Sequence, residues 1–232
     1  MRLIRASALA IAAALVVSAA HGVAFQMDPD RVVPGGGIFA AGWKGRIDAG
    51  SVKQGRNIND SKFEQQGNTI TLTVGPAAVY WNPANTASGD YTVKASFREP
   101  KYMSANSHPH PYGIFIGGTK LDTDAPTLVY CEPYGDGRVL VRGFSAGTVF
   151  TPLRATANPA VHKAAADGSV TQDVMWTVKG GRAECSINGT VVAGYDTAEI
   201  VGPGKLESLN GVYGLRVSHN LDVVVIGFGM TK

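Results

Sequence analysis

Short runs in which apolar and polar residues alternate follow one another along most of the chain. Thr69 to Val74, Tyr91 to Phe97 and Arg138 to Phe144 are typical, and they are rich in β-branched and aromatic residues. A period of two places one set of side chains on each face of a strand. Long stretches with the period of a helix are nearly missing. The pattern therefore predicts an all-β chain.

Turn-forming residues separate these runs at the spacing typical of short antiparallel strands. Gln66-Gly67-Asn68, Gly135-Asp136-Gly137, Lys179-Gly180-Gly181 and Asn188-Gly189 offer the positive φ angles of tight hairpins. The stretch Thr151 to Ser169 breaks the rhythm with prolines and alanines, and it is predicted to be an irregular insertion with one short helix. The remaining predicted strands are Ala78–Trp81, Tyr112–Gly117, Thr127–Glu132, Val174–Lys179, Arg182–Ile187, Thr190–Ala193, Val212–Val217 and Val223–Met230.

The first residues have the layout of a secretory signal. Arg2 and Arg5 precede the apolar run Ala8 to Val17, and small residues follow it. The run is shorter than the roughly 20 residues that a membrane-spanning helix needs, and no later segment is long enough either. We therefore expect an exported protein, periplasmic or extracellular, with the exact cleavage site left open. The expected division is a signal peptide at 1–22, a flexible entry at 23–42 and a single β-sandwich domain at 43–232.

Charge and cysteine content narrow the partners and the compartment. The chain has 21 Lys and Arg against 18 Asp and Glu, and these basic residues form no run. A surface that follows a phosphate backbone normally shows such a run, so we expect no nucleic-acid partner. The two cysteines, Cys131 and Cys185, lie in predicted strands and could form one disulfide if their Cα atoms come within about 7 Å. Two small buried thiols are the alternative.

Two segments read as buried strands with polar ends: His108 to Gly118 and Gly211 to Val223. Together with the hairpin Asp136-Gly137-Arg138 and the turn Ile187-Asn188-Gly189, they resemble secreted bacterial proteins of the concanavalin A-like lectin and glucanase superfamily. That superfamily includes laminin-G-like modules, family 16 glucanases and 3-keto-disaccharide hydrolase domains. The resemblance implies a jelly roll of two antiparallel sheets, one with a concave face that meets carbohydrate.

The chain departs from the glucanase pattern in its acidic residues. A retaining glycosidase needs two carboxyl groups about 5 to 5.5 Å apart, yet no strand here carries alternating acids. Glu132 and Asp136 come nearest, but Pro133 and Gly135 break the strand between them, so we expect both to be solvated turn residues. An inverting pair assembled from distant loops stays open.

Sugar sites combine aromatic rings with planar polar groups. Arg138 and Arg142 have the even spacing that puts both on one strand face. The alternative for each candidate is a core or rim aromatic, or an arginine that covers apolar surface. The predicted ligand-binding residues are Trp81, His108, His110, Tyr112, Arg138, Arg142, Arg216 and Asn220.

His108 and His110 lie on one side of an extended backbone, and His219 could join them as a third metal ligand. Interleaved prolines and the lack of visible supporting carboxylates argue against a metal, so no cofactor is expected; a structural Ca²⁺ stays open. Gly143-Phe144-Ser145-Ala146-Gly147 matches the pattern of a nucleophile elbow. We interpret it as a hairpin turn, because β-branched residues follow where a helix is required.

These observations favour an exported, non-catalytic glycan-binding module whose oligomeric state the sequence leaves open. One alternative is a carbohydrate-active enzyme, either a glycoside hydrolase or a 3-keto-glycoside hydrolase or lyase. The other is a protein-interaction module of the cell envelope.

Overall fold

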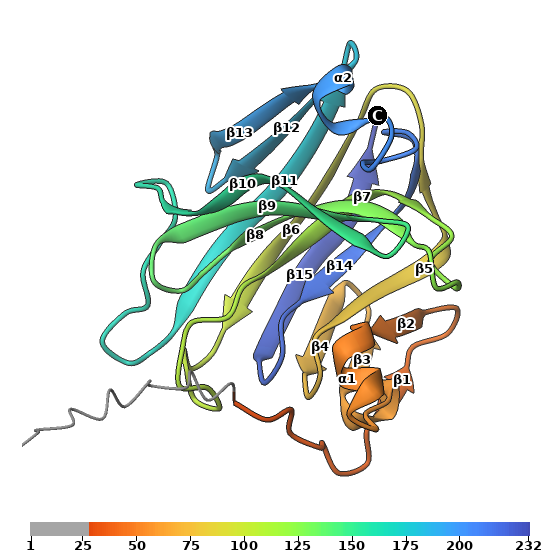
Figure 1. Ribbon diagram of the computed structural model, residues 1–232. Helices are drawn as coiled ribbons and strands as arrows, with labels where there is room; N and C mark the ends of the chain where they lie inside the picture. Colours follow the sequence, from red (N-terminus) through yellow and green to blue (C-terminus); the bar gives the residue numbers. More distant parts are fainter. Residues whose placement is uncertain (1–27) are drawn as a thin grey trace, which may run out of the picture.

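Two β-sheets packed face to face make up residues 28–232, which are the residues that the computed structural model describes (Figure 1). In spatial order, the eight-stranded sheet consists of β1 (Gly37–Phe39), β3 (Lys62–Gln66), β4 (Thr69–Thr73), β15 (Asp222–Thr231), β6 (Tyr91–Glu99), β11 (Val170–Lys179), β12 (Arg182–Ile187) and β13 (Thr190–Asp196). The seven-stranded sheet consists of β10 (Thr148–Ala157), β9 (Arg138–Ser145), β8 (Thr127–Pro133), β7 (Tyr112–Thr119), β14 (Gly211–Val217), β5 (Ala78–Ala87) and β2 (Lys44–Ile47). The short helical segments are α1 (Ala49–Lys53), η1 (Ile58–Asp60) and α2 (Thr197–Ile200).

The predicted all-β sandwich is confirmed. Each predicted strand lies within a strand of the structure or ends within one residue of it, and the predicted hairpins join neighbouring antiparallel strands. The prediction for Thr151 to Ser169 is wrong in its first part, because β10 occupies Thr148–Ala157 and no helix forms there. β10 is an edge strand whose pairing with β9 is interrupted twice, so its side chains show no clear alternation of burial.

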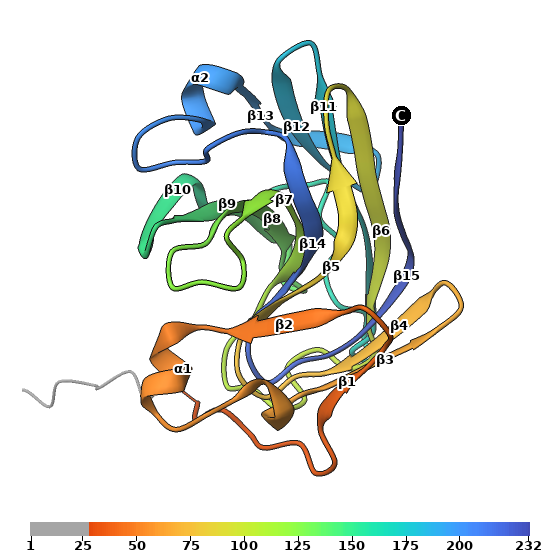
Figure 2. The same ribbon diagram turned by 90° about the vertical axis from the view of Figure 1, so that its right-hand side faces the viewer.

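The core lies between the two sheets, which Figure 2 shows from the side. Phe63, Tyr80, Phe97 and Trp176 are fully buried there, and the Trp176 indole N–H donates a hydrogen bond to the backbone carbonyl of Ile114 across the core, 3.0 Å away. A buried indole needs such a partner, because an unpaired polar group costs free energy. This bond therefore links β11 of one sheet with β7 of the other.

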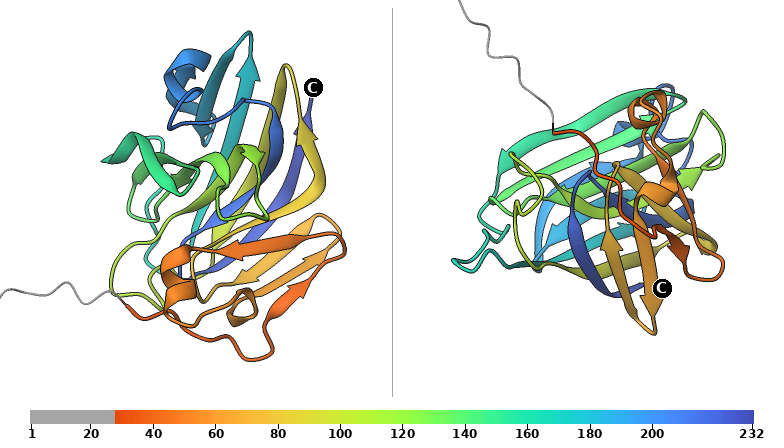
Figure 3. Two further views of the ribbon diagram at one scale, coloured as in Figure 1. Left: turned by 45° about the vertical axis from the view of Figure 1, so that its right-hand side comes forward. Right: turned by 90° about the horizontal axis from the view of Figure 1, so that it is seen from below.

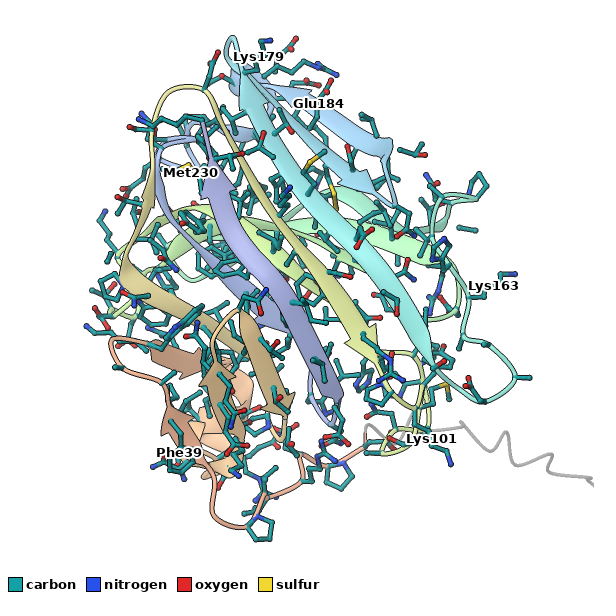
Figure 4. The ribbon with its side chains drawn as sticks, turned by 180° about the vertical axis from the view of Figure 1, so that it is seen from behind. Phe39, Lys101, Lys163, Lys179, Glu184 and Met230 are labelled. Carbon is teal, nitrogen blue, oxygen red and sulfur yellow. A yellow bond between two sulfur atoms is a disulfide. The ribbon has the colours of Figure 1, made fainter. Side chains whose placement is uncertain are left out.

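A disulfide also joins the sheets. Cys131 on β8 and Cys185 on β12 are bonded with their Cα atoms 6.4 Å apart, and the yellow sulfur pair is visible in the interior in Figure 4. Both residues occupy core-facing positions of their strands. The sequence left open whether these cysteines form a disulfide or stay as two buried thiols, and in the structure they form the disulfide.

The segment before Trp43 contributes to the fold, in contrast to the expected flexible entry. β1 pairs in parallel with β3, and the chain ahead of it crosses the lower end of the sandwich (Figure 3). The Arg31 backbone N–H donates to Asn220 Oδ1 at 2.8 Å, and the Arg31 guanidinium pairs with Asp222 at 2.6 Å. These contacts join residues far apart in sequence, which local patterns do not reveal.

The expected signal peptide at 1–22 lies outside the described residues, and the expected cleavage site stays a prediction. Within residues 28–232, no helix has both the length and the apolar character needed to cross a bilayer.

Candidate functional site

The outer face of the seven-stranded sheet, which points away from the other sheet, carries a second apolar cluster. Side chains alternate along each strand, so Val129 and Cys131 of β8 face the core while Leu128 and Tyr130 face outward. These outward side chains are nevertheless buried, and the same holds for Phe115 of β7, which has no exposed surface. Hollows lined in part by these outward side chains open on this face.

At one end of this face lies a hollow of about 230 Å³, which we call the polar hollow. It lies where β7 begins, where β8 ends and where the turn between β14 and β15 comes close. Its lining residues are His108, Pro109, His110, Pro111, Tyr130, Glu132, Tyr134, Leu140, Arg142, Arg216, Ser218 and His219.

Gly113 of β7 lies between two strands that contribute lining residues to the polar hollow. It pairs with Arg216 on β14 and lies beside Glu132 on β8. A Cβ atom on Gly113 would lie 2.0 Å from the carbonyl oxygen of Cys131, far inside van der Waals contact. The close approach of β7 and β8 therefore requires glycine here.

Arg216 is held rigidly under the polar hollow. Two of its guanidinium nitrogens donate to the two carboxylate oxygens of Asp48, at 2.6 and 2.7 Å. Burial lowers the pKa of Arg216 and the Asp48 carboxylate raises it, with the net result above the ordinary value. The guanidinium also lies 5.4 Å from the ring centres of Tyr130 and Phe144. Among the described residues, its Nε atom is buried without a hydrogen-bond partner.

Glu132 is the buried acid of the polar hollow, and the expectation of a solvated turn residue is wrong for it. Its exposed fraction is 3%, and its Oε1 atom has no hydrogen-bond partner within the described part of the chain. Burial raises the pKa of Glu132 to about 8, although Arg216 and Arg142 act in the opposite direction. At neutral pH this group is therefore mainly a neutral carboxylic acid, able to donate one hydrogen bond as well as accept others.

Aromatic rings and arginines line the other side of the hollow. Tyr134 is half-buried, and the Arg138 guanidinium lies 4.6 Å from its ring centre while Arg138 Nε donates to Asp136 Oδ2 at 2.7 Å. Arg142 is exposed and unpaired within residues 28–232. This arrangement offers a ligand one aromatic surface and one free guanidinium.

Three histidines form the remaining wall, the histidine cluster of His108, His110 and His219. One candidate ligand atom from each lies within 4.8 Å of the others. His110 Nδ1 lies 2.7 Å from the carbonyl oxygen of His219, and His110 Nε2 lies 2.7 Å from His108 Nε2. Burial lowers the pKa of His110 to about 4 and also lowers the pKa of His219.

Two carboxylates from the N-terminal segment approach this cluster from behind. Asp30 Oδ1 lies 3.0 Å from His219 Nδ1, at an angle that does not make a hydrogen bond. Asp28 Oδ2 lies 3.7 Å from His108 Nδ1 and accepts a hydrogen bond from the backbone N–H of Ser107, which lowers the pKa of Asp28. Both carboxylates are distant in sequence from the histidines that they approach, so local sequence patterns do not reveal them.

The structure brings together four of the predicted ligand-binding residues: His108, His110, Arg142 and Arg216. Arg138 lies at the margin, in contact with Tyr134.

Three of the predicted ligand-binding residues lie elsewhere. Tyr112 faces the core, fully buried, and its ring centre lies 5.5 Å from that of Phe97, because it has the opposite strand parity to the outward Phe115. The Asn220 amide binds the N-terminal segment through Arg31 and Pro29. Trp81 is on the outer face but lines a separate hollow of about 310 Å³.

The serine motif forms a hairpin, as interpreted from the sequence. Ser145 ends β9 and Thr148 begins β10, with Ala146 and Gly147 at positive φ between them. A strand therefore follows where a nucleophile elbow requires a helix.

No protein-family model matches the chain, and no curated protein matches it. Solved structures do resemble it. The carbohydrate-binding module CBM66 from Bacillus subtilis has a TM-score of 0.53 and 10% identity, over 82% of this chain and 96% of that one. The chain has the concanavalin A-like β-sandwich fold.

Two further structures share this fold. A protein of unknown function with a galectin-like fold from Bacillus subtilis has a TM-score of 0.53 and 15% identity, over 81% of this chain and 88% of that one. The GH16 protein of the Bacteroides ovatus mixed linkage glucan PUL, in complex with a G4G4G3G product, has a TM-score of 0.52 and 10% identity, over 82% of this chain and 95% of that one. Identities this low establish the fold alone, so function has to be argued from the site.

Proposed function

We propose that the protein is an exported glycan-binding module that holds a glycan or glycan-derived ligand in the polar hollow and releases it unchanged. The observation that supports this most is the meeting of Tyr134, Arg142 and Glu132 in one hollow of the outer face. The C–H faces of a sugar pack on aromatic rings, and its hydroxyls exchange hydrogen bonds with guanidinium and carboxyl groups. The hollow offers all three kinds of group.

The size of the hollow fits one sugar unit rather than a long chain. Its volume of about 230 Å³ is below the roughly 300–1,000 Å³ typical of sites for drug-sized ligands. Two more hollows lie on the same face, one beside Arg46 and Phe144 and one beside Trp81. Neighbouring sugar units would extend over the outer face toward them.

Two independent observations agree with this proposal. CBM66, a carbohydrate-binding module, has the same fold. The disulfide between Cys131 and Cys185 supports export, because such bonds persist in oxidising compartments outside the cytosol.

Glu132 favours one second candidate, acid–base catalysis on the bound sugar. A buried carboxyl with a raised pKa in a hollow is a common feature of catalytic sites. Glycosidases of both stereochemical classes, however, use a pair of carboxyl groups. Among residues 28–232, Glu132 is the single carboxyl that lines the polar hollow. We therefore place binding first and a Glu132-dependent reaction second.

The test is retention of tag-free protein on a panel of polysaccharides, with released sugar assayed in the same tubes. Arg142→Ala and Tyr134→Ala should weaken retention at least tenfold, the loss of about 1.4 kcal/mol that one charged or aromatic contact supplies. Arg98→Ala is the matched control, because Arg98 is exposed on the outer side of the eight-stranded sheet.

Retention that is equal in wild type, Arg142→Ala and Tyr134→Ala would refute the location of the site. Sugar release that Glu132→Gln abolishes, while retention persists, would establish the second candidate instead.

A further inference from the structure

Each imidazole of the histidine cluster has one nitrogen within 4 Å of an oxygen atom. A carbonyl oxygen only accepts hydrogen bonds, so His110 Nδ1 carries a proton and donates it to the carbonyl oxygen of His219. Asp30 lies behind Nδ1 of His219 and Asp28 behind Nδ1 of His108. Metal-binding histidines typically have a carboxylate or carbonyl beside the second ring nitrogen. Within residues 28–232 the contact is a hydrogen bond for His110, whereas for His219 and His108 it is the approach of a carboxylate. The arrangement leaves Nε2 of each ring as the available nitrogen.

Two of the available nitrogens lie close enough to share one proton. His108 Nε2 and His110 Nε2 lie 2.7 Å apart, a distance at which two lone pairs repel unless a proton lies between them. A metal ion can replace this proton. Two nitrogens at 2.0–2.1 Å from a tetrahedral Zn²⁺ are about 3.3 Å apart, so His108 has to move by about half an ångström. Its side chain is 48% exposed and has room to do so.

We propose that His108, His110 and His219 bind one divalent transition-metal ion, best matched by Zn²⁺, at the wall of the polar hollow. Three imidazoles suit Zn²⁺, whereas Ca²⁺ and Mg²⁺ prefer oxygen ligands. Zinc sites with three protein ligands keep a fourth position for water or for a substrate group. Here that position faces the hollow that all three histidines line.

Metal binding requires one defined rearrangement. The rings of His110 and His219 are stacked, with centres 4.0 Å apart and planes inclined by 28°. A ligand lone pair lies in the plane of its ring, so the His219 ring has to turn out of this stack to share an ion with His110. The ring signals of His219 and His110 in NMR spectra should therefore shift together on addition of Zn²⁺.

The N-terminal segment completes the proposed site. Asp28 and Asp30 come from the segment that Arg31 anchors to Asn220. Replacing a carboxylate that supports a metal-binding histidine typically lowers metal affinity 10- to 100-fold. Asp30→Asn should therefore weaken Zn²⁺ binding by about that factor, although Asp30 is not itself a ligand.

The experiment titrates the chelator-treated, tag-free protein with Zn²⁺ alone in a calorimeter, and with Co²⁺ in an absorption spectrometer. We expect one ion per chain and the intense visible bands of four-coordinate Co²⁺. His108→Ala and His219→Ala should each lower the affinity at least tenfold, whereas His162→Ala, an exposed histidine outside the cluster, should not. Circular dichroism verifies folding, and the exposed His108 gives a variant that leaves the core untouched.

A stoichiometry well below one, or equal affinities in wild type, His108→Ala and His219→Ala, would overturn the proposal. Because Zn²⁺ is the only ligand in this titration, its outcome is independent of glycan binding. Retention on polysaccharide without a metal site would leave the proposed function standing, and a metal site without retention would leave this inference standing.

Discussion

Replacing Glu132 with glutamine should make the stability of the protein less dependent on pH. The carboxyl is buried with an exposed fraction of 3%, and burial raises its pKa from an ordinary 4.5 to about 8. The folded protein therefore holds this proton more tightly than the unfolded chain does. The contribution of Glu132 to the free energy of unfolding is fully present below pH 4.5. It is lost as the pH rises toward 8, because the unfolded chain gives up this proton at lower pH than the folded protein does.

The size of the effect follows from the shift. One pKa unit corresponds to about 1.4 kcal/mol, and most of the shift lies between pH 5 and pH 8. Over this interval the wild type should lose roughly 3 to 4 kcal/mol of unfolding free energy through Glu132. Glutamine is neutral at every pH and nearly the same size. The free energy of unfolding of Glu132→Gln, relative to wild type, should therefore rise by that amount from pH 5 to pH 8.

The assay is urea unfolding of both proteins, disulfide intact, at several pH values from 5 to 8. Other groups that titrate in this interval, such as the buried Glu99, are present in both proteins and cancel in the difference. Glu64→Gln, a change at an exposed carboxylate on β3, is the control and should show no such trend. A difference between Glu132→Gln and wild type that stays constant within about 1 kcal/mol would refute the reasoning.

Three further substitutions test the contacts that hold the strands and the N-terminal segment around the site. Replacing Cys131 and Cys185 with alanine should cost about 4 kcal/mol in urea unfolding, because the bond closes a loop of 54 residues. Gly113→Ala should lower the melting temperature by several degrees, a cost of about 1–3 kcal/mol, whereas Gly229→Ala, where a Cβ meets open space, should be neutral. Arg31→Ala should cost about 1–3 kcal/mol and make the N-terminal segment sensitive to limited proteolysis.

Most strands could be predicted because one of their faces is buried and the other is not, which produces alternation. β10 could not, since as an edge strand it is largely exposed on both faces. β7 presents the opposite difficulty. Nearly all its residues are buried, so the sequence pattern does not indicate which side chains face the core. Tyr112 is predicted to bind ligand from the outer face, whereas its side chain is buried in the core.

The sequence predicts contacts within the site only between residues that are close together in the chain. His108 and His110 meet because residues two apart share a side of an extended backbone. Glu132 is not recognisable as a site residue from the sequence, because Pro133 and Gly135 predict a solvated turn. In the structure β8 includes both Glu132 and Pro133, and Glu132 keeps the outward parity of Tyr130. Asp30 reaches His219 from 189 positions away in the chain, a contact that exists only once the sandwich has formed.

The two ends of the described chain lie at opposite ends of the sandwich (Figure 1). Asp28 lies beside His108, whereas β15 runs for ten residues, about 30 Å, from the turn next to His219 toward Lys232. Anything fused ahead of Asp28 therefore begins beside the histidine cluster, where a polyhistidine tag would add competing imidazoles. Attachment through Lys232 holds the protein by the end of the sandwich that is far from the histidine cluster, which makes the C-terminus the attachment point for affinity columns and sensor surfaces.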